Sequence, residues 1–172
     1  MDNQPLIITR ILAEKDYAEI QHLLETQARN DWNHITSKTI SQQFELLRSG
    51  NAIASVFEAQ QVAGVSIMLL GDSCFKAMAK YAKLGEMAFI QDVVVHEGHA
   101  GKGLGSKLLL ESIQQASQRG YKAVYLERHE ENLASAGMMR KVGFDEVETF
   151  YDPNRRVSGS RNTTVMKKEL AN

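Results

Sequence analysis

The sequence predicts an α+β fold with one mixed β-sheet at its centre, and three observations lead to this prediction. Short β-rich runs alternate with stretches of helical periodicity along the whole chain. The run Met87–Val95 lacks the polar–apolar alternation of a half-exposed strand, which indicates a central strand buried on both faces. Gly120 and Gly143 each stop a helical stretch that is followed by another strand run.

In chain order the patterns predict β-α-α-β-β-β-α-β-α-β-β. The predicted strands are residues 6–12, 52–59, 62–70, 87–95, 122–128, 144–151 and 162–170. The predicted helices are residues 13–29, 36–48, 103–119 and 132–142. Residues 60–61 suit a tight hairpin turn, residues 72–85 fit either a short helix or a mobile loop, and residues 152–161 form a polar loop.

Length and composition limit the class of protein. The 172 residues show no internal repeat, low-complexity stretch or linker, so one domain over residues 1–172 is expected. With 20 basic and 21 acidic residues the net charge is -1, which argues against a nucleic-acid partner. No stretch approaches the ~20 apolar residues that a membrane span needs. The single Cys74 and the lack of a signal peptide favour a cytoplasmic protein.

Three glycines stand where the buried strand passes into the next helix, at Gly101, Gly103 and Gly105. Glycine allows the backbone to approach a ligand closely, and the start of a helix offers free N–H groups to an anion such as phosphate. Ser106 stands where the dinucleotide fingerprint and the phosphate-binding loop of NTPases each require a glycine, so both fingerprints fail. The mid-chain position also differs from those folds, which place their loop after the first strand.

The glycine segment resembles the acetyl-CoA pyrophosphate loop of the GNAT superfamily of N-acetyltransferases. The family pattern [QR]-x-x-G-x-[GA] is matched at Gly103 and Gly105, but its first position is Ala100. A second motif follows downstream, where Asn132 and Ser135 fit the start of N-x-x-[AS]-x-x-x-Y-x-x-x-G-F. This stretch ends in Gly143-Phe144, as the motif requires, and both motifs lie in the family's order. Asn132 is equally suited to cap a helix.

The resemblance implies a fold and a co-substrate. The sheet would carry helices on both faces, and its fourth and fifth strands would splay apart to admit acetyl-CoA. The residues implied to contact it are Val93, Val94, Val95, Gly101, Lys102, Gly103, Leu104, Gly105, Ser106, Asn132 and Ser135. No metal is expected, because the pair His96 and His99 lacks a third ligand nearby.

In the family, an amine attacks the thioester directly, so a base must take its proton. Glu127 is the first candidate, because relatives that acetylate protein N-termini often carry a catalytic Glu at its offset, five residues before Asn132. Asp92, on the strand beside the cleft, is the second candidate, and His129 is the third. Glu127 is almost as well explained as a surface carboxylate.

The family often uses a Tyr as the acid that protonates the thiolate, and the matching position is Met139. Methionine cannot donate a proton. Solvent, Tyr151 or Tyr125 could serve instead.

The acceptor is expected to be a small-molecule amine, shaped by the variable segments 13–48 and 152–161. The residues of interest there are Trp32, His34, Arg155, Arg156 and Arg161. Arginines beside a cleft would suit an anionic group on the acceptor. The alternatives are a protein N-terminal acetyltransferase, an aminoglycoside-modifying enzyme, and a non-catalytic CoA-binding regulatory module. Relatives commonly form homodimers.

Overall fold

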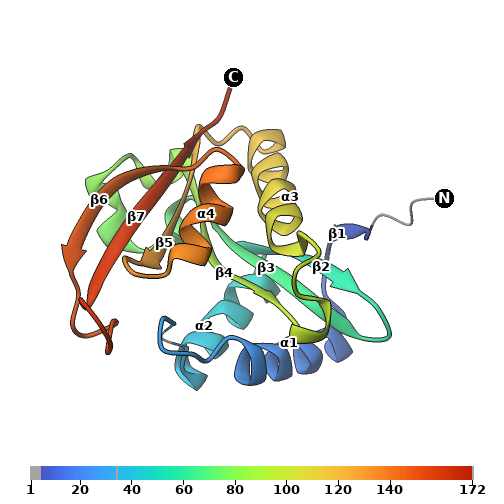
Figure 1. The fold of residues 1–172 in the computed structure, drawn as a ribbon. Coiled ribbons are helices and arrows are strands. Elements are labelled where there is room, and N and C mark those ends of the chain that lie inside the picture. Colours follow the sequence, from blue (N-terminus) through green and yellow to red (C-terminus); the bar gives the residue numbers. More distant parts are fainter. Residues whose placement is uncertain (1–4, 34, 172) are drawn as a thin grey trace.

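The computed structural model describes residues 5–33 and 35–171, and its centre is a seven-stranded mixed sheet (Figure 1). The strands lie in the order β1-β2-β3-β4-β5-β7-β6, and every neighbouring pair is antiparallel except β4 and β5, which are parallel. The strand bounds are β1 Ile7–Arg10, β2 Ala52–Glu58, β3 Val62–Leu70, β4 Met87–Val95, β5 Ala123–His129, β6 Asp145–Tyr151 and β7 Asn162–Glu169. The predicted fold class is confirmed.

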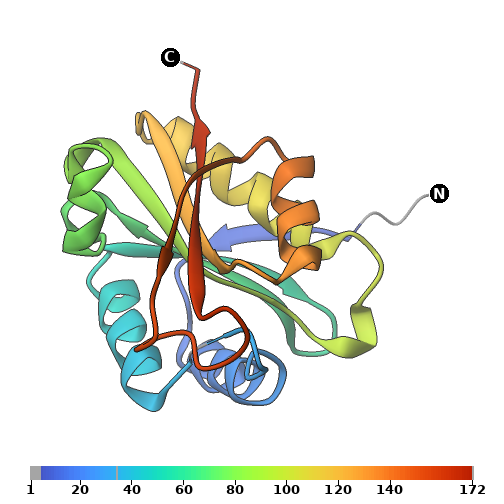
Figure 2. The ribbon, with the colours of Figure 1, turned by 60° about the vertical axis from the view of Figure 1, so that its left-hand side comes forward.

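Helices cover both faces of the sheet, as predicted. The bounds are α1 Glu14–Gln27, α2 Ser37–Arg48, α3 Leu104–Gln118 and α4 Leu133–Lys141. Helices α1 and α2 lie on one face, and α3 and α4 lie on the other (Figures 1 and 2). Each pair of helices closes its own hydrophobic core against the sheet.

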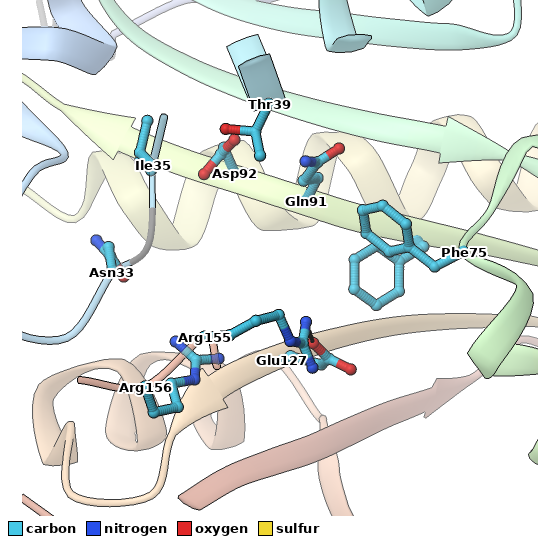
Figure 3. Close-up of a pocket in the computed structure, with 10 residues that line it drawn as sticks. Asn33, Ile35, Thr39, Phe75, Gln91, Asp92, Glu127, Arg155 and Arg156 are labelled. Carbon is cyan, nitrogen blue, oxygen red and sulfur yellow. Dashed lines mark hydrogen bonds and ion pairs between the residues drawn. The ribbon is translucent and has the colours of Figure 1, made fainter. Parts of the chain in front are cut away.

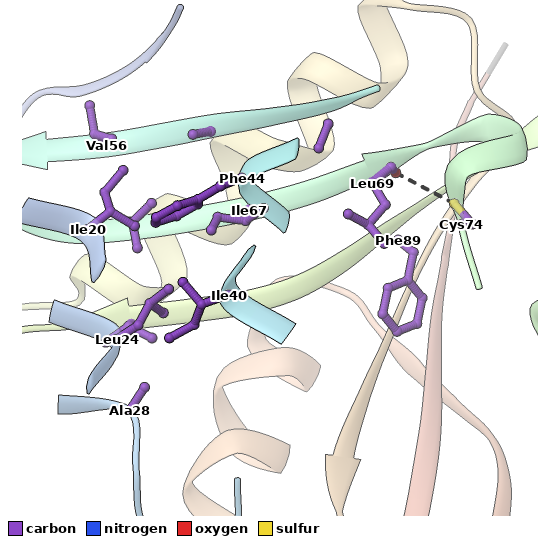
Figure 4. Close-up of a cluster of buried hydrophobic side chains, with 14 of the residues drawn as sticks. Ile20, Leu24, Ala28, Ile40, Phe44, Val56, Ile67, Leu69, Cys74 and Phe89 are labelled. Carbon is purple, nitrogen blue, oxygen red and sulfur yellow. Dashed lines mark hydrogen bonds between the residues drawn. The ribbon is translucent and has the colours of Figure 1, made fainter. Parts of the chain in front are cut away.

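The core beneath α1 and α2 shows why these segments are helical. Ile20 and Leu24 of α1 meet Ile40 and Phe44 of α2, and all four are buried (Figure 4). The spacing of four residues within each pair places both members on one helix face. Helix α1 packs on β3 and β4 and α2 packs on β2, and the side chain of Gln43 reaches from α2 to Asp92 of β4.

The sheet opens between β4 and β5. The parallel ladder runs only from Met87↔Ala123 to Ile90↔Leu126, although both strands continue beyond it. On its other side, β4 carries an irregularity, because Ile67 pairs with Asp92 and the next residue, Met68, pairs with Ile90. Gln91 is therefore the extra residue of a β-bulge, a feature that bends a strand and often lies next to active sites. The predicted splay of the two strands is confirmed.

Residues 71–86 contain the segment 72–85, for which the sequence allowed either a short helix or a mobile loop. They form three short 3₁₀ segments, Gly71–Ser73, Lys76–Lys80 and Leu84–Glu86, in place of one α-helix. The turn between β2 and β3 is also wider than predicted, because Ala59 N–H bonds to Gln61 O across a three-residue loop followed by a bulge. Over the described part of the chain, no helix is both long and apolar enough to cross a bilayer.

Candidate active site

A narrow cavity of about 90 Å³ occupies the opening between β4 and β5. Its walls come from both splayed strands and from α3 and α4. The lining residues include the predicted Asp92, Val93, Val94, Glu127, Asn132 and Ser135. Val93 to Val95 pair with Ser66 to Gly64 of β3 on one side only, since the β5 ladder has already ended. The other edge of this segment is therefore the place where an extended ligand could pair with the backbone.

The glycine segment has the backbone that such a loop requires. Gly101 and Gly103 both adopt positive φ, at 76° and 73°, and nothing lies within 4 Å of a Cβ added at either one. Gly103 caps α3, whose first N–H groups lack partners within the helix. Leu104 contributes only backbone, because its side chain is buried. Lys102 is exposed beside the loop.

Gly105 is needed for a different reason. A Cβ at this position would lie 2.6 Å from Met138 Sδ, so the missing side chain leaves room for Met138 of α4 against α3. The family pattern thus marks one backbone conformation, at Gly103, and one packing contact, at Gly105, while Gly101 adds a second positive φ outside the pattern. Ala100, which departs from the pattern, is exposed and has no polar side chain. The neighbouring His99 does not replace it, because its ring packs against Phe57 at a centroid distance of 5.3 Å.

The start of α4 completes the narrow cavity. Asn132 caps the helix, since its Oδ1 accepts a hydrogen bond from Ser135 N at 3.2 Å. Both residues also line the cavity, so capping and ligand contact are compatible. Met139 is buried at the same wall. Tyr125 is buried away from the cavity, in the core of the opposite face, and Tyr151 is 64% exposed.

A second cavity of about 260 Å³ adjoins the first, and the two share Asn33, Gln91, Asp92 and Glu127. Gln91 and Asp92 project from β4 on one side, and Glu127 projects from β5 on the other (Figure 3). The remaining lining residues are Ile35, Thr39, Phe75, Phe89, Arg155 and Arg156. Two consecutive residues of a regular strand would face opposite sides, so the bulge at Gln91 accounts for both of them reaching this cavity.

Asp92 is a half-buried carboxyl group, and none of the cations among the described residues forms an ion pair with it. Burial raises the pKa of Asp92 to about 7, and a hydrogen bond from Gln43 partly opposes this rise. Gln43 Nε2 donates to Asp92 Oδ2 at 2.7 Å. A carboxylate with a pKa near neutrality is suited to accept and release protons under physiological conditions.

Glu127 has a different environment, because Arg155 occupies it. Arg155 Nη1 lies 2.7 Å from Glu127 Oε2, and its Nη2 lies 2.8 Å from Asp152. Burial disfavours the charge on Arg155, but the bonds to Glu127 and Asp152 outweigh this effect and raise its pKa. The side chain of Glu127 is only 12% exposed. The first candidate base of the sequence therefore lies in the site as a partner of an arginine.

Two distant loops join above the larger cavity. Arg156 Nη1 donates to Trp32 O at 2.8 Å, and Ser158 Oγ donates to Asp31 O at 2.5 Å. His129 strengthens the junction, since its Nε2 bonds to Ser158 O at 2.8 Å while its ring lies 4.7 Å from that of Trp32.

The same bonds exclude His129 as the base. Its Nδ1 accepts a hydrogen bond from Glu131 N, so Nε2 carries the ring hydrogen and donates it to Ser158 O. Both ring nitrogens are thus engaged in holding the loop. The third candidate of the sequence is a structural residue.

The remaining sequence candidates divide into those in the site and those outside it. Arg155 and Arg156 line the larger cavity, whereas Arg161 is exposed and does not. His34 lies outside the described residues. Asn33, Thr39, Phe75 and Gln43 were not found from the sequence. Gln43 carried a signal, because it is a polar residue on the helix face of Ile40, Phe44 and Leu47.

Within the described ranges, one cluster has the carboxylates to hold a metal ion: Asp16, Glu19 and Glu58. It lies away from both cavities, and Arg10 already pairs with Asp16 and Glu58.

A sequence model of the acetyltransferase (GNAT) family matches residues 17–144, which include both glycine motifs and the two splayed strands. The chain belongs to this family of acetyltransferases. No curated protein matches the sequence at a significant level.

Solved structures share the fold of this acetyltransferase at low sequence identity. A ribosomal-protein-alanine N-acetyltransferase from Brucella melitensis has a TM-score of 0.72 at 21% identity, covering 95% of this chain and 99% of its own. The ribosomal-protein-S18-alanine N-acetyltransferase of Escherichia coli has a TM-score of 0.74 at 16% identity, covering 97% of each chain. YncA of Salmonella typhimurium, a putative acetyltransferase solved with acetyl-CoA, has a TM-score of 0.72 at 21% identity, covering 97% of this chain and 95% of its own.

Proposed function

We propose that this acetyltransferase transfers the acetyl group of acetyl-CoA to a primary amine of a small molecule, and that Asp92 is the general base. The observation that carries the proposal is the position of Asp92. It lies at the junction of the narrow cavity between β4 and β5 and the larger cavity beside it. A group at this junction can reach an amine in one cavity and a thioester in the other.

The narrow cavity and the glycine loop suit acetyl-CoA, which supplies the activated acetyl group as a thioester. The free edge of Val93 to Val95 suits an extended arm with amide groups. The positive-φ glycines and the start of α3 suit a pyrophosphate. Ala100 leaves the loop without the polar side chain of the family pattern, so backbone groups would carry most of the phosphate contact.

Asp92 suits the base better than Glu127 does. An alkyl ammonium group has a pKa near ~10 and must lose a proton before it can attack. Burial has already raised the pKa of Asp92 to about 7, and no cation of residues 5–33 or 35–171 forms an ion pair with it. In Glu127, by contrast, Oε2 accepts a hydrogen bond from Arg155. Glu127 therefore suits a role in holding Arg155 at the acceptor cavity.

The thiolate needs no dedicated acid. Met139 cannot donate a proton, and the two tyrosines considered from the sequence lie away from the cavities. A thiol has a pKa near ~8.5, so the leaving thiolate can take a proton from water near neutral pH.

The hydrogen bonds that join residues 31–32 to residues 156–158 favour a small acceptor over a polypeptide. A protein N-terminus needs a groove that continues outward for the chain behind it, whereas Asp31 and Trp32 are bonded to Ser158 and Arg156 across the site. The cavity volume of about 260 Å³ also lies near the lower end for ligand sites. The cytoplasmic location and the homodimer stay predictions from composition and family resemblance.

The test is release of free CoA from acetyl-CoA, measured with a panel of small amines and with an alanine-terminated peptide. We expect turnover with at least one small amine and a loss of about 100-fold or more in kcat for Asp92→Asn. Turnover with the peptide alone would replace the small-molecule proposal by N-terminal acetylation. Binding of acetyl-CoA without turnover of any amine would indicate a CoA-binding module.

A further inference from the structure

The only side chain that hydrogen-bonds to Asp92 in the described chain comes from a different element, helix α2. Gln43 Nε2 donates to Asp92 Oδ2 at 2.7 Å. Gln43 is 1% exposed and does not line either cavity, so it touches the base and not the ligand. One turn earlier on α2, Thr39 lines the larger cavity beside Asp92 (Figure 3).

Gln43 is a costly residue to bury. It lies among Ile40, Phe44 and other core residues, and its Oε1 has no hydrogen-bond partner among the described residues. A buried carbonyl oxygen without a partner destabilises a folded protein. A methionine of the same length would avoid this penalty, so the contribution of Gln43 to stability does not explain its presence.

The helix that carries Gln43 is firmly placed. Thr36 and Thr39 form a reciprocal capping box, with Thr39 N bonded to Thr36 Oγ1 at 3.1 Å and Thr36 N bonded to Thr39 Oγ1 at 3.0 Å. Ile40 and Phe44 then anchor the same face in the core. The amide of Gln43 therefore reaches Asp92 from a fixed direction.

We propose that Gln43 is a positioning residue for acetyl transfer, which holds the Asp92 carboxylate toward the junction of the two cavities and stabilises its ionised form by donating a hydrogen bond from Nε2. This proposal rests on the role of Asp92 in the proposed function. This role in catalysis explains why Gln43 is present although its Oε1, which has no hydrogen-bond partner among the described residues, costs stability.

The sign of the effect follows from the direction of the bond. A hydrogen bond donated to a carboxylate favours the charged form, so its loss raises the pKa of the carboxyl group. The other charged groups that face Asp92 are Glu127 of β5 and Arg155 and Arg156 of the β6–β7 loop. Thr39 and Gln43 of α2 and Ile67 of β3 face it without charge. A substitution at Gln43 changes only this one neighbour and leaves the other groups that face Asp92 as they are.

The experiment compares Gln43→Met with Gln42→Met, an exposed neighbour on the same helix. The carboxyl ¹³C resonance of Asp92 is titrated in the unliganded protein, and kcat is measured against pH for the acceptor found above. We expect Gln43→Met to raise the titration midpoint and the acidic limb of kcat by about one pH unit. Gln42→Met is expected to leave both unchanged. At about pH 5, where Asp92 is protonated in both proteins and needs no hydrogen bond to an ionised form, the melting temperature of Gln43→Met should match or exceed that of the wild type.

Gln43→Glu provides a second variant of nearly the same shape. Its carboxylate would raise the midpoint of Asp92 further through like-charge repulsion. A midpoint of Asp92 that stays at the wild-type value in both variants would overturn the positioning role. If the midpoint moves as expected while the pH dependence of kcat does not, the contact stands and Asp92 is not the base, so the two proposals fail separately.

Discussion

Glu127 and Arg155 form an ion pair of 2.7 Å on a wall shared by two cavities. One is the 260 Å³ cavity with Asp92, and the other has about 430 Å³ and is lined by Phe75, Tyr81, Glu148 and Phe150 among others. A pair in this position can shape the acceptor site without accepting the proton of the amine.

The first prediction separates this role from that of a base. Glu127→Gln removes the charge that holds Arg155, so we expect the KM for the acceptor to change several-fold while kcat falls by less than about tenfold. Arg155→Met should give a similar change, and the double variant should be no worse than either single variant, because both break one contact. Steady-state kinetics measure this. A loss in kcat as large as that of Asp92→Asn would make Glu127 the base.

The second prediction concerns pH and follows from the pKa of about 7 for Asp92. The base acts only when ionised, so kcat should fall about tenfold per unit as the pH drops below about 7. The folded-state pKa lies above the unfolded value near ~3.9, so the stability that this group contributes is lost as pH rises toward 7. Asp92→Asn should therefore raise the melting temperature more at pH 8 than at pH 4, and thermal unfolding at both values checks this. Equal shifts would contradict it.

The third prediction compares two glycines with open surroundings. Gly103 has a φ of 73°, where a side chain is strained, so Gly103→Ala should cost about 1 kcal/mol of stability and raise the KM for acetyl-CoA. Gly137 lies within α4 without positive φ, so Gly137→Ala should stabilise the protein by about 1 kcal/mol. Denaturant unfolding measures both, and a stabilising Gly103→Ala would remove the backbone argument for this loop.

The fourth prediction restores the family residue at Ala100. This position is exposed, so Ala100→Arg creates no packing conflict. If the pyrophosphate binds at the glycine loop, the added cation should tighten binding of CoA several-fold, and the gain should shrink at high salt. Calorimetric titration at two salt concentrations tests this, with Ala100→Gln as the uncharged control. A gain that is independent of salt would place the phosphates elsewhere.

The fifth prediction concerns a buried ion pair far from the site. Arg10 bonds twice to Asp16, at 2.6 and 3.0 Å, and the Asp16 side chain is fully buried. Burial tends to raise the pKa of Asp16, but the bonds from Arg10 and from Ala13 N–H outweigh this and lower it. Arg10→Met should therefore cost about 3 kcal/mol near neutral pH. Because the pKa is lowered by folding, the difference from wild type should shrink below about pH 4.

The control for this pair is the exposed pair of Lys122 and Glu86, at 2.8 Å. Lys122→Met should change the unfolding midpoint little at any pH. If Arg10→Met were as mild as Lys122→Met, the Arg10–Asp16 pair would not anchor the start of α1.

The fold and the geometry of the glycine loop could be predicted from local patterns. The strand β4, the glycines at 101 and 103 and the cap at Asn132 are each encoded within a few neighbouring residues. The acceptor half could not, because its determinants are contacts between distant segments. In the sequence Glu127 has no visible partner, because the 152–161 loop brings Arg155 to it only in the fold. Asp92 likewise gains its hydrogen bond only when α2 brings Gln43 to it. His129 likewise reads as a candidate base until Ser158 occupies its ring.

The strand order has a consequence for the way the chain is made. Strand β7, near the C-terminal end, lies between β5 and β6, with Ala123 to His129 on one side and β6 on the other. Strands β1 to β5 and the glycine loop precede residue 151 in the chain, so they leave the ribosome before the 152–161 loop and β7 do. The acceptor cavity cannot close until β7 has emerged and taken its place, because the 152–161 loop is held by the two strands that flank it. Completion of the larger cavity thus depends on the last strand of the sheet to be synthesised.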